Sequence, residues 1–529
     1  MTSASLKGSL EIDPNRVGRP RFDPYQRLLG RFYEQLFLLH ALGQTRGSHT
    51  PLSFDVDVRQ AKSRRFLQNL CYICDFRKGG STCTAIGLEE LDTYYNFCVA
   101  SNRETDKIVA FLHTALDTLR AITHPVGTGH VYSESQFATR CIKFASERVD
   151  EEKRCLRRYA KDCLSKLSGH IAASGKLTIS LFSRINRSNS LDLVAWLNTA
   201  MNFDDNFALC NFAHDNRHSS LVKELERRGV KEETGLNPTS KRSCFIMMRH
   251  YIGRLAHHIR ASSELIQDTE ELRHVLDNYA VCPIYAPPAV PTPICDSHVN
   301  LRGILNRMFK KNSEDKDSLK EGLLHLHKVA GIFDTFIRQY NGSTLEVHAE
   351  LQVLEYFWKL RKTFAGEDRF IACSKPACFC CELYFKYHPA RVMVSSSHRK
   401  IWTKWSPPNV EQLDRKCPTA MQQRNIVNKM TETLREQVFS HVIQCVPSKR
   451  WHPDSITNIT DTRGPSFGSY SLEISDETPG TLPSIVLGFQ RNRRAIFTNT
   501  EVSGNIDTAP DFDGISDPEN GGVSLSGYT

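Results

Sequence analysis

Apolar residues recur at helical spacing through most of the chain before residue 280. Large apolar side chains stand three and four positions apart from Pro24 onward, with polar residues between them. This pattern predicts a mostly α-helical domain over residues 23–280, to which the sequence attaches no chemistry. The clearest helical stretches are residues 28–37, 108–119, 135–168 and 245–272.

The pattern changes at residues 284–297, where four prolines stand close together. Proline lacks a backbone N–H and fixes φ, so we expect a semi-extended linker here. A second domain should follow over residues 298–446, which makes the chain an α+β protein. Its expected elements are helices at 326–340 and 426–443 and strands at 369–373 and 391–395.

Both ends of the chain have polar, loop-like compositions. Residues 1–22 suggest a flexible arm, and residues 447–529 suggest a largely disordered tail. Residues 501–529 carry six acidic side chains and no Lys or Arg, so the net charge of +9 leaves the remainder at 9 plus 6, or +15. A basic body suits nucleic acid or nucleotide phosphates, but it equally suits the solvated surface of a helical protein.

Composition indicates an intracellular protein without a membrane span. The 40% hydrophobic and 24% charged residues are ordinary for a folded protein, and the 17 cysteines show no pairing rhythm. The start has no signal-like apolar stretch, and no run reaches the ~18 apolar residues that cross a bilayer. We therefore expect reduced thiols and a cytoplasmic or nuclear location.

The candidate chemistry lies between His348 and Cys381. His348 and Glu350 open an apolar helical stretch, and Cys378 and Cys381 form a C-x2-C pair at the start of a second helix. Two thiolates and one imidazole can hold Zn²⁺ while the fourth corner stays open for water. Zn²⁺ lowers the pKa of such a water to roughly 7, and Glu350 is placed to move protons.

These motifs resemble the cytidine deaminase superfamily, whose H-A-E and P-C-x-x-C signatures occur here as VHAELQVL and ACSKPACFCC. With the later SSHRKIWTKW, the chain is most similar to a fungal group of nucleic acid and nucleotide deaminases related to bacterial toxin deaminases. The resemblance implies that His348, Cys378 and Cys381 bind zinc and that Glu350 is the proton shuttle. It also implies a three-layer α/β/α domain around a small mixed sheet.

Two departures from the family pattern leave alternatives open. Pro376 stands two residues before Cys378 rather than next to it, and Cys380 offers a further thiol, so Cys378 with Cys380 is an alternative ligand pair. The family fold also needs a β-hairpin before His348. Only residues 344–347 read as a strand there, so the location of the hairpin is open.

Three other patterns have structural readings that we prefer. Cys71 and Cys74 also form C-x2-C, but they lie in an apolar helical stretch without a partner pair, which favours buried thiols. The same reasoning favours structural or solvated roles for paired histidines, which are His257 with His258 and His325 with His327.

The loop after the cysteines contains aromatic and cationic residues side by side. Trp402, Lys404 and Trp405 are candidate substrate-binding residues, because indole rings stack on bases and Lys contacts phosphates. The alternative is that both tryptophans pack on the core.

The resemblance implies a zinc-dependent hydrolytic deaminase. Hydroxide generated at the zinc attacks the ring carbon that carries the amine, Glu350 carries the proton, and ammonia leaves. The substrate would be a nucleobase, a nucleoside or nucleotide, or single-stranded nucleic acid. The alternative is a catalytically silent deaminase-like scaffold with structural zinc, and the oligomeric state is not indicated by the sequence.

Overall fold

A computed structural model describes residues 23–51, 57–123, 133–174, 181–234, 242–293, 299–309, 314–394, 396–408, 417–443 and 451–455. The predicted arm lies outside these residues, and so does the predicted tail apart from residues 451–455.

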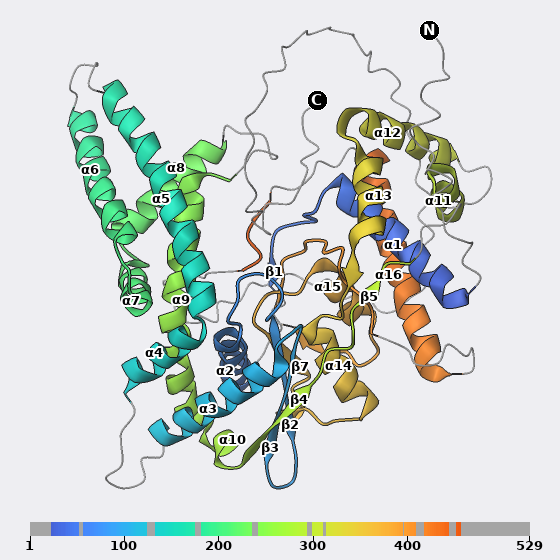
Figure 1. Cartoon of the computed structure of the whole chain (residues 1–529), viewed down its shortest axis with the longest axis horizontal. Helices are drawn as coiled ribbons and strands as arrows, with labels where there is room; N and C mark the ends of the chain where they lie inside the picture. Colours follow the sequence, from blue (N-terminus) through green and yellow to red (C-terminus); the bar gives the residue numbers. More distant parts are fainter. Residues whose placement is uncertain are drawn as a thin grey trace, which may run out of the picture.

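A five-stranded mixed sheet lies at the centre of the described chain, with strand order β4-β3-β2-β7-β8 (Figure 1). Pairing is antiparallel between β2 and β3 and between β2 and β7, and it is parallel at both edges. The strands are β1 (Thr50–Pro51), β2 (Thr84–Glu90), β3 (Tyr95–Ser101), β4 (Tyr279–Ile284), β5 (Val290–Pro291), β6 (Thr344–Leu345), β7 (Phe370–Cys373), β8 (Met393–Val394) and β9 (Ser396–Ser397).

The helices up to β4 are α1 (Pro24–Leu42), α2 (Val58–Cys74), α3 (Thr105–Thr123), α4 (Glu134–Phe144), α5 (Ser146–Ser174), α6 (Leu181–Met201), α7 (Asn206–Asn216), α8 (Ser220–Thr234), α9 (Cys244–Glu271) and α10 (Arg273–Asp277). Those after β5 are α11 (Leu301–Met308), α12 (Glu314–Ala330), α13 (Ile332–Gly342), α14 (Ala349–Lys359), α15 (Phe379–Tyr387) and α16 (Pro418–Ile443). The α+β class predicted from the sequence is confirmed.

The hairpin that the resemblance requires is β2–β3. It runs in continuous register from Thr84 paired with Ser101 to Glu90 paired with Tyr95. The helices α3 to α10 are inserted between this hairpin and α14, which displaces it far upstream of His348. The sequence did not reveal the hairpin, because its strands lie far upstream of His348 instead of next to it.

The sheet takes strands from both of the predicted domains. Strands β2 and β3 lie within residues 23–280 and β4 crosses the end of that range, whereas β7 and β8 lie within residues 298–446. The predicted boundary therefore does not separate two cores. The predicted linker is described up to residue 293, and within it β5 pairs with β6. Pro283, just before the linker, lies in edge strand β4, where the missing backbone N–H is tolerated.

Side chains alternate between two apolar cores, one on each face of the sheet. One face joins α1 and the helices after β5, through Ala85, Cys98, Ala100, Ile371 and Cys373. The other face joins α2 to α9, through Ile86, Leu88, Phe97, Val99, Phe370 and Ala372. The sheet thus lies between two helical layers, as the resemblance implied.

A side chain is unfavourable at two glycines, at one because of close packing and at the other because of its backbone conformation. A Cβ on Gly87 of β2 would lie 2.7 Å from the ring of Phe357, because α14 packs directly on this strand. Gly331 has a left-handed φ of 59° and separates α12 from α13, so the single helix predicted at 326–340 is two helices.

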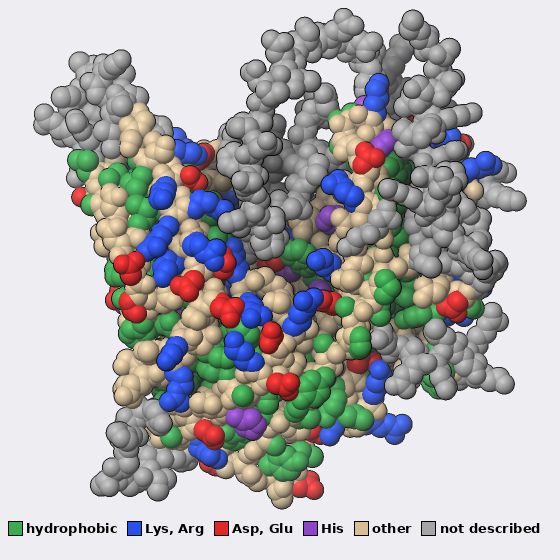
Figure 2. Space-filling model, viewed as in Figure 1, with side chains coloured by type: hydrophobic (Ala, Val, Ile, Leu, Met, Phe, Trp, Pro, Cys, Tyr) green, Lys and Arg blue, Asp and Glu red, His purple; other side chains and the backbone are tan. Residues whose placement is uncertain are grey.

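The inserted helices surround α9, which packs against α2, α4, α5, α7 and α8 (Figure 1). On the face shown in Figure 2, Lys and Arg side chains are interspersed with Asp and Glu rather than gathered in one patch. None of the described helices combines the length and the apolar character that a bilayer span requires.

Candidate metal centre

The three predicted ligands lie at the starts of two helices. His348 is the N-cap of α14, and Cys378 is the N-cap of α15. The backbone N–H of Cys381, in the first turn of α15, donates to the Cys378 sulfur at 3.4 Å. The unpaired N–H groups and the dipole of a helix N-terminus favour thiolate.

The ligand atoms converge to the spacing of a metal site. The Nδ1 atom of His348 lies 3.3 Å from the Cys381 Sγ and 3.7 Å from the Cys378 Sγ. Zn–S and Zn–N bonds of ~2.3 and ~2.0 Å in a tetrahedron place sulfur and nitrogen about 3.5 Å apart. In the described part of the chain, this is the one group of three potential ligands within 4.8 Å of one another. The residues therefore fit a tetrahedral metal ion.

Cys380 is not part of this convergence. Its thiol is fully buried like that of Cys381, but the atoms brought together belong to His348, Cys378 and Cys381. The geometric reason is the helix: Cys381 stands three residues after Cys378, so both sulfurs lie on one side of the first turn. The structure supports the C-x2-C pair over the alternative with Cys380.

The three candidate ligands influence one another's pKa values. Burial raises the pKa of Cys378, but hydrogen bonding from Cys381 and the neighbouring His348 outweigh it and lower the pKa to about 6. Burial lowers the pKa of His348, but the Cys378 and Glu350 charges raise it to about 9. Burial and the Cys378 thiolate hold the pKa of Cys381 well above its ordinary value. A metal ion would displace the protons on His348 and Cys381, since only deprotonated ligands bind.

Glu350 lies beside the ligands without belonging to them. Its carboxylate is buried in the first turn of α14, and Oε1 is 4.0 Å from the Nδ1 of His348. A carboxylate this close to the ligand side chains would be able to exchange protons with a group bound at a metal that they held.

Asn102 is a residue that the sequence did not single out. Its Oδ1 accepts the backbone N–H of Ala349 at 2.8 Å, so it caps the helix that carries Glu350. It follows β3 directly, and it becomes visible as a site residue only once the hairpin is located.

Asp75 connects the inserted helices to the loop before α15. Its carboxylate accepts hydrogen bonds from the hydroxyl groups of Thr82 at 2.8 Å and Ser374 at 3.2 Å. It also lies 3.4 Å from the Nζ of Lys375. Arg148, fully buried in α5, donates to the Asp75 carbonyl at 2.8 Å. The inserted helices thereby help to fix the segment that leads into the cysteines.

The three candidate substrate-binding residues have different surroundings. Lys404 is exposed, and Trp402 is half-buried with its indole N–H donated to Nε2 of His398 at 3.3 Å. Trp405 is fully buried, so its ring faces cannot stack on a base, and the expectation for this residue is corrected. The alternative of core packing describes Trp405.

The other predicted structural roles agree with the observed positions. Cys71 and Cys74 are buried in α2. His258 contacts the buried Glu152 at 3.1 Å, and His257 accepts a hydrogen bond from Arg260.

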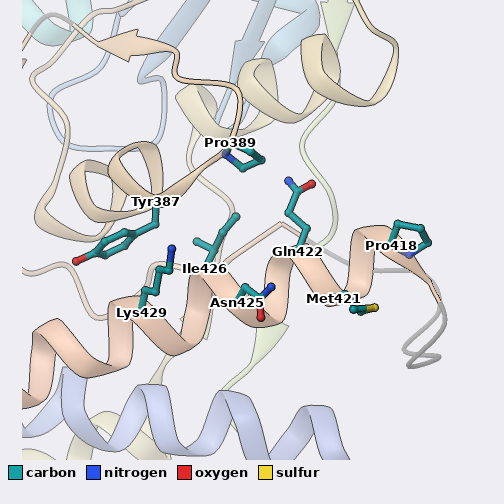
Figure 3. Close-up of a pocket in the computed structure, with 8 residues that line it drawn as sticks. All are labelled: Tyr387, Pro389, Pro418, Met421, Gln422, Asn425, Ile426 and Lys429. Carbon is teal, nitrogen blue, oxygen red and sulfur yellow. The ribbon is translucent and has the colours of Figure 1, made fainter. Parts of the chain in front are cut away.

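A surface pocket of about 430 Å³ lies elsewhere (Figure 3). It opens at the C-terminal end of α15, whereas Cys378 caps the N-terminal end, and nine helical residues at ~1.5 Å each put about 13 Å between them. The pocket is thus separate from the candidate metal centre. It is lined by Tyr387, Pro389, Pro418, Met421, Gln422, Asn425, Ile426 and Lys429.

The helix-borne His/Cys/Cys group with an adjacent glutamate fits a class of site, the metal site typical of deaminases. A comparison with family models agrees, because residues 347–409 match the OTT_1508-like deaminase family. The matched segment contains all three candidate ligands and Glu350, and it supports a deaminase domain in this chain. No curated protein and no solved structure matches the chain.

Proposed function

We propose that the protein is a zinc-dependent hydrolytic deaminase acting on a nucleobase, free, in a nucleotide or in single-stranded nucleic acid. The observation that carries the proposal is the convergence of His348, Cys378 and Cys381 beside a buried, non-ligating Glu350. A purely structural zinc site has four protein ligands, and the described group has three.

The four residues have two roles, metal binding and proton transfer. His348, Cys378 and Cys381 would hold the metal, and Zn²⁺ when bound supplies a polarised water that is nucleophilic at neutral pH. Glu350 accepts the proton of that water and returns it to the departing amine, which leaves as ammonia. Burial strengthens these electrostatic effects, because Glu350 is only 3% exposed.

The test begins with a substrate screen. Zinc-loaded protein should release ammonia from at least one member of a panel of free bases, nucleosides, nucleotides and single-stranded DNA and RNA. If a fully loaded protein released ammonia from none of them, the deaminase proposal would fail and a scaffold role would take its place.

Glu350→Gln then tests the mechanism. Glutamine keeps the shape and the hydrogen-bonding capacity but cannot carry a proton, so we expect ammonia release to fall by ~10²-fold or more with zinc content unchanged. Glu382→Gln is the matched control, because Glu382 lies in the first turn of α15 and faces Arg399 at 3.6 Å. Wild-type turnover in Glu350→Gln would refute the mechanism, and loss of zinc with unfolding would make Glu350 structural.

A further inference from the structure

Trp405 makes a hydrogen bond that its burial alone does not require. Its indole N–H donates to the Cys381 sulfur at 3.2 Å, and the side chain is fully buried. The family-model match includes this residue but says nothing of its contact.

This bond completes a symmetric pattern around the two sulfurs. The Cys378 sulfur accepts the backbone N–H of Cys381, and the Cys381 sulfur accepts the N–H of Trp405. A hydrogen bond to a thiolate withdraws electron density from sulfur and stabilises its negative charge. Each sulfur thus accepts an N–H, one supplied by the helix start and one by an indole.

We propose that Trp405 is a positioning residue for the metal, which orients the Cys381 sulfur and moderates the charge that this sulfur donates. The proposal rests on the metal-binding part of the proposed function and is independent of the reaction and its substrate. Outer contacts of this kind orient ligands and tune the metal that they hold.

The surroundings of Trp405 fix the indole in this orientation. The hydroxyl of Tyr33 in α1 donates to the Trp405 carbonyl at 3.1 Å, and the ring of Phe32 lies 5.4 Å from the indole. Trp405 therefore gives α1, far away in sequence, an indirect contact with the metal centre.

The backbone around Trp405 is also attached to the segment that carries His348. Glu346 donates its N–H to the Lys404 carbonyl at 2.7 Å and accepts the N–H of Ser406 at 2.8 Å. The segment 404–406 thus contacts Cys381 through the Trp405 side chain. Through its backbone it contacts Glu346, which stands two residues before His348.

The test is Trp405→Phe, which keeps an aromatic ring but removes the donor. We expect zinc to be lost to a competing chelator about 10- to 100-fold more readily, the usual consequence of losing such a contact. In the cobalt-substituted protein, the sulfur-to-cobalt charge-transfer band should move to lower energy, because the sulfur lone pair is no longer stabilised.

Trp402→Phe is the matched control. It makes the same chemical change three residues earlier, where the indole N–H reaches His398 instead of a sulfur. We expect its zinc affinity and cobalt spectrum to equal those of the wild type. Unchanged zinc affinity and an unmoved band in Trp405→Phe would overturn the proposal.

A measurement on the unmutated side chain covers the case in which Trp405→Phe does not fold. The chain has five tryptophans, and ¹⁵N-indole labelling reports each N–H by NMR. One indole signal, retained in Trp402→Phe, should shift or broaden strongly when cobalt replaces zinc. Five indole signals that are the same in both metal forms would refute the contact.

Discussion

The chain contains the C-x2-C pattern twice, and the two copies have different surroundings. Cys71 and Cys74 lie in the last turns of α2, whereas Cys378 and Cys381 open α15. At the end of a helix the backbone N–H groups are already used within the helix, but at its start they are free to donate to sulfur. Identical spacing therefore gives different chemistry according to its place on the helix.

The thiol pKa values follow this difference. Burial raises the pKa values of Cys71 and Cys74 well above the ordinary range. Cys378 is equally buried, yet hydrogen bonding and the adjacent His348 lower its pKa to about 6. Protonated buried thiols pack as small apolar groups, and a thiolate beside a histidine binds metal.

Two buried glutamates repeat the contrast. Glu152 in the inserted helices is enclosed by two arginines and an imidazole, with its Oε1 2.6 Å from Arg254 and 3.2 Å from Arg148 and its Oε2 3.1 Å from His258. Glu350 instead lies 4.0 Å from the imidazole of His348 and beside the Cys381 thiol. The first carboxylate is saturated by permanent partners, and the second is left able to exchange protons.

Cysteine replacements should give the largest difference between the two copies. Cys381→Ser removes one of three ligands, so zinc affinity should fall by more than the ~100-fold upper range for outer contacts. Cys74→Ser and Cys380→Ser change equally buried thiols outside the cluster and should leave one zinc bound. Metal analysis after gel filtration measures this, and a zinc-free Cys380→Ser with a loaded Cys381→Ser would reverse the ligand assignment.

The candidate metal centre was predictable because its signals are local. Helical spacing after His348 and the position of Cys378 at a helix start both follow from neighbouring residues, and the structure places these elements as expected. The preference for Cys381 over Cys380 needed only the geometry of one helical turn.

The remaining contacts depend on long-range topology that one sequence does not reveal. The hairpin β2–β3 is separated from α14 by the inserted helices, so neither it nor Asn102 could be assigned to the site. For Trp405, aromatic and cationic neighbours suggested a surface, but the contacts with α1 that bury it lie in a distant segment.

Glu152→Gln should have the next largest effect, and on stability rather than on metal. Glutamine removes the carboxylate that pairs with the buried Arg148 and Arg254, and losing one partner of a buried ion pair costs about 3–5 kcal/mol. Urea unfolding at pH 7 measures the loss, and Glu350→Gln is the matched control with little expected change. Equal midpoints for Glu152→Gln and the wild type would mean that this network does not stabilise the fold.

The smallest predicted effect is the pH dependence of the stability difference between the wild type and Glu152→Gln. Burial raises the pKa of Glu152, but Arg254, His258 and Arg148 outweigh it and hold the pKa well below the ordinary value. The unfolded chain therefore takes up this proton first as the pH falls, so the stabilisation is complete above the unfolded pKa of ~4.3 and is lost below it.

One proton bound preferentially by the unfolded chain gives a slope of at most ~1.4 kcal/mol per pH unit. The stability gap between the wild type and Glu152→Gln should thus stay constant from pH 7 to about 5 and shrink below ~4.3. The arginines keep their charge throughout. The comparison is made in a His258→Gln background, because burial lowers the pKa of the adjacent His258 while Glu152 raises it, and the gap would otherwise contain both groups. Urea midpoints at a series of pH values measure the gap. A gap that persists unchanged to pH 3 would show that the folded and unfolded chains bind the Glu152 proton equally, and the contrast with Glu350 would then rest on geometry alone.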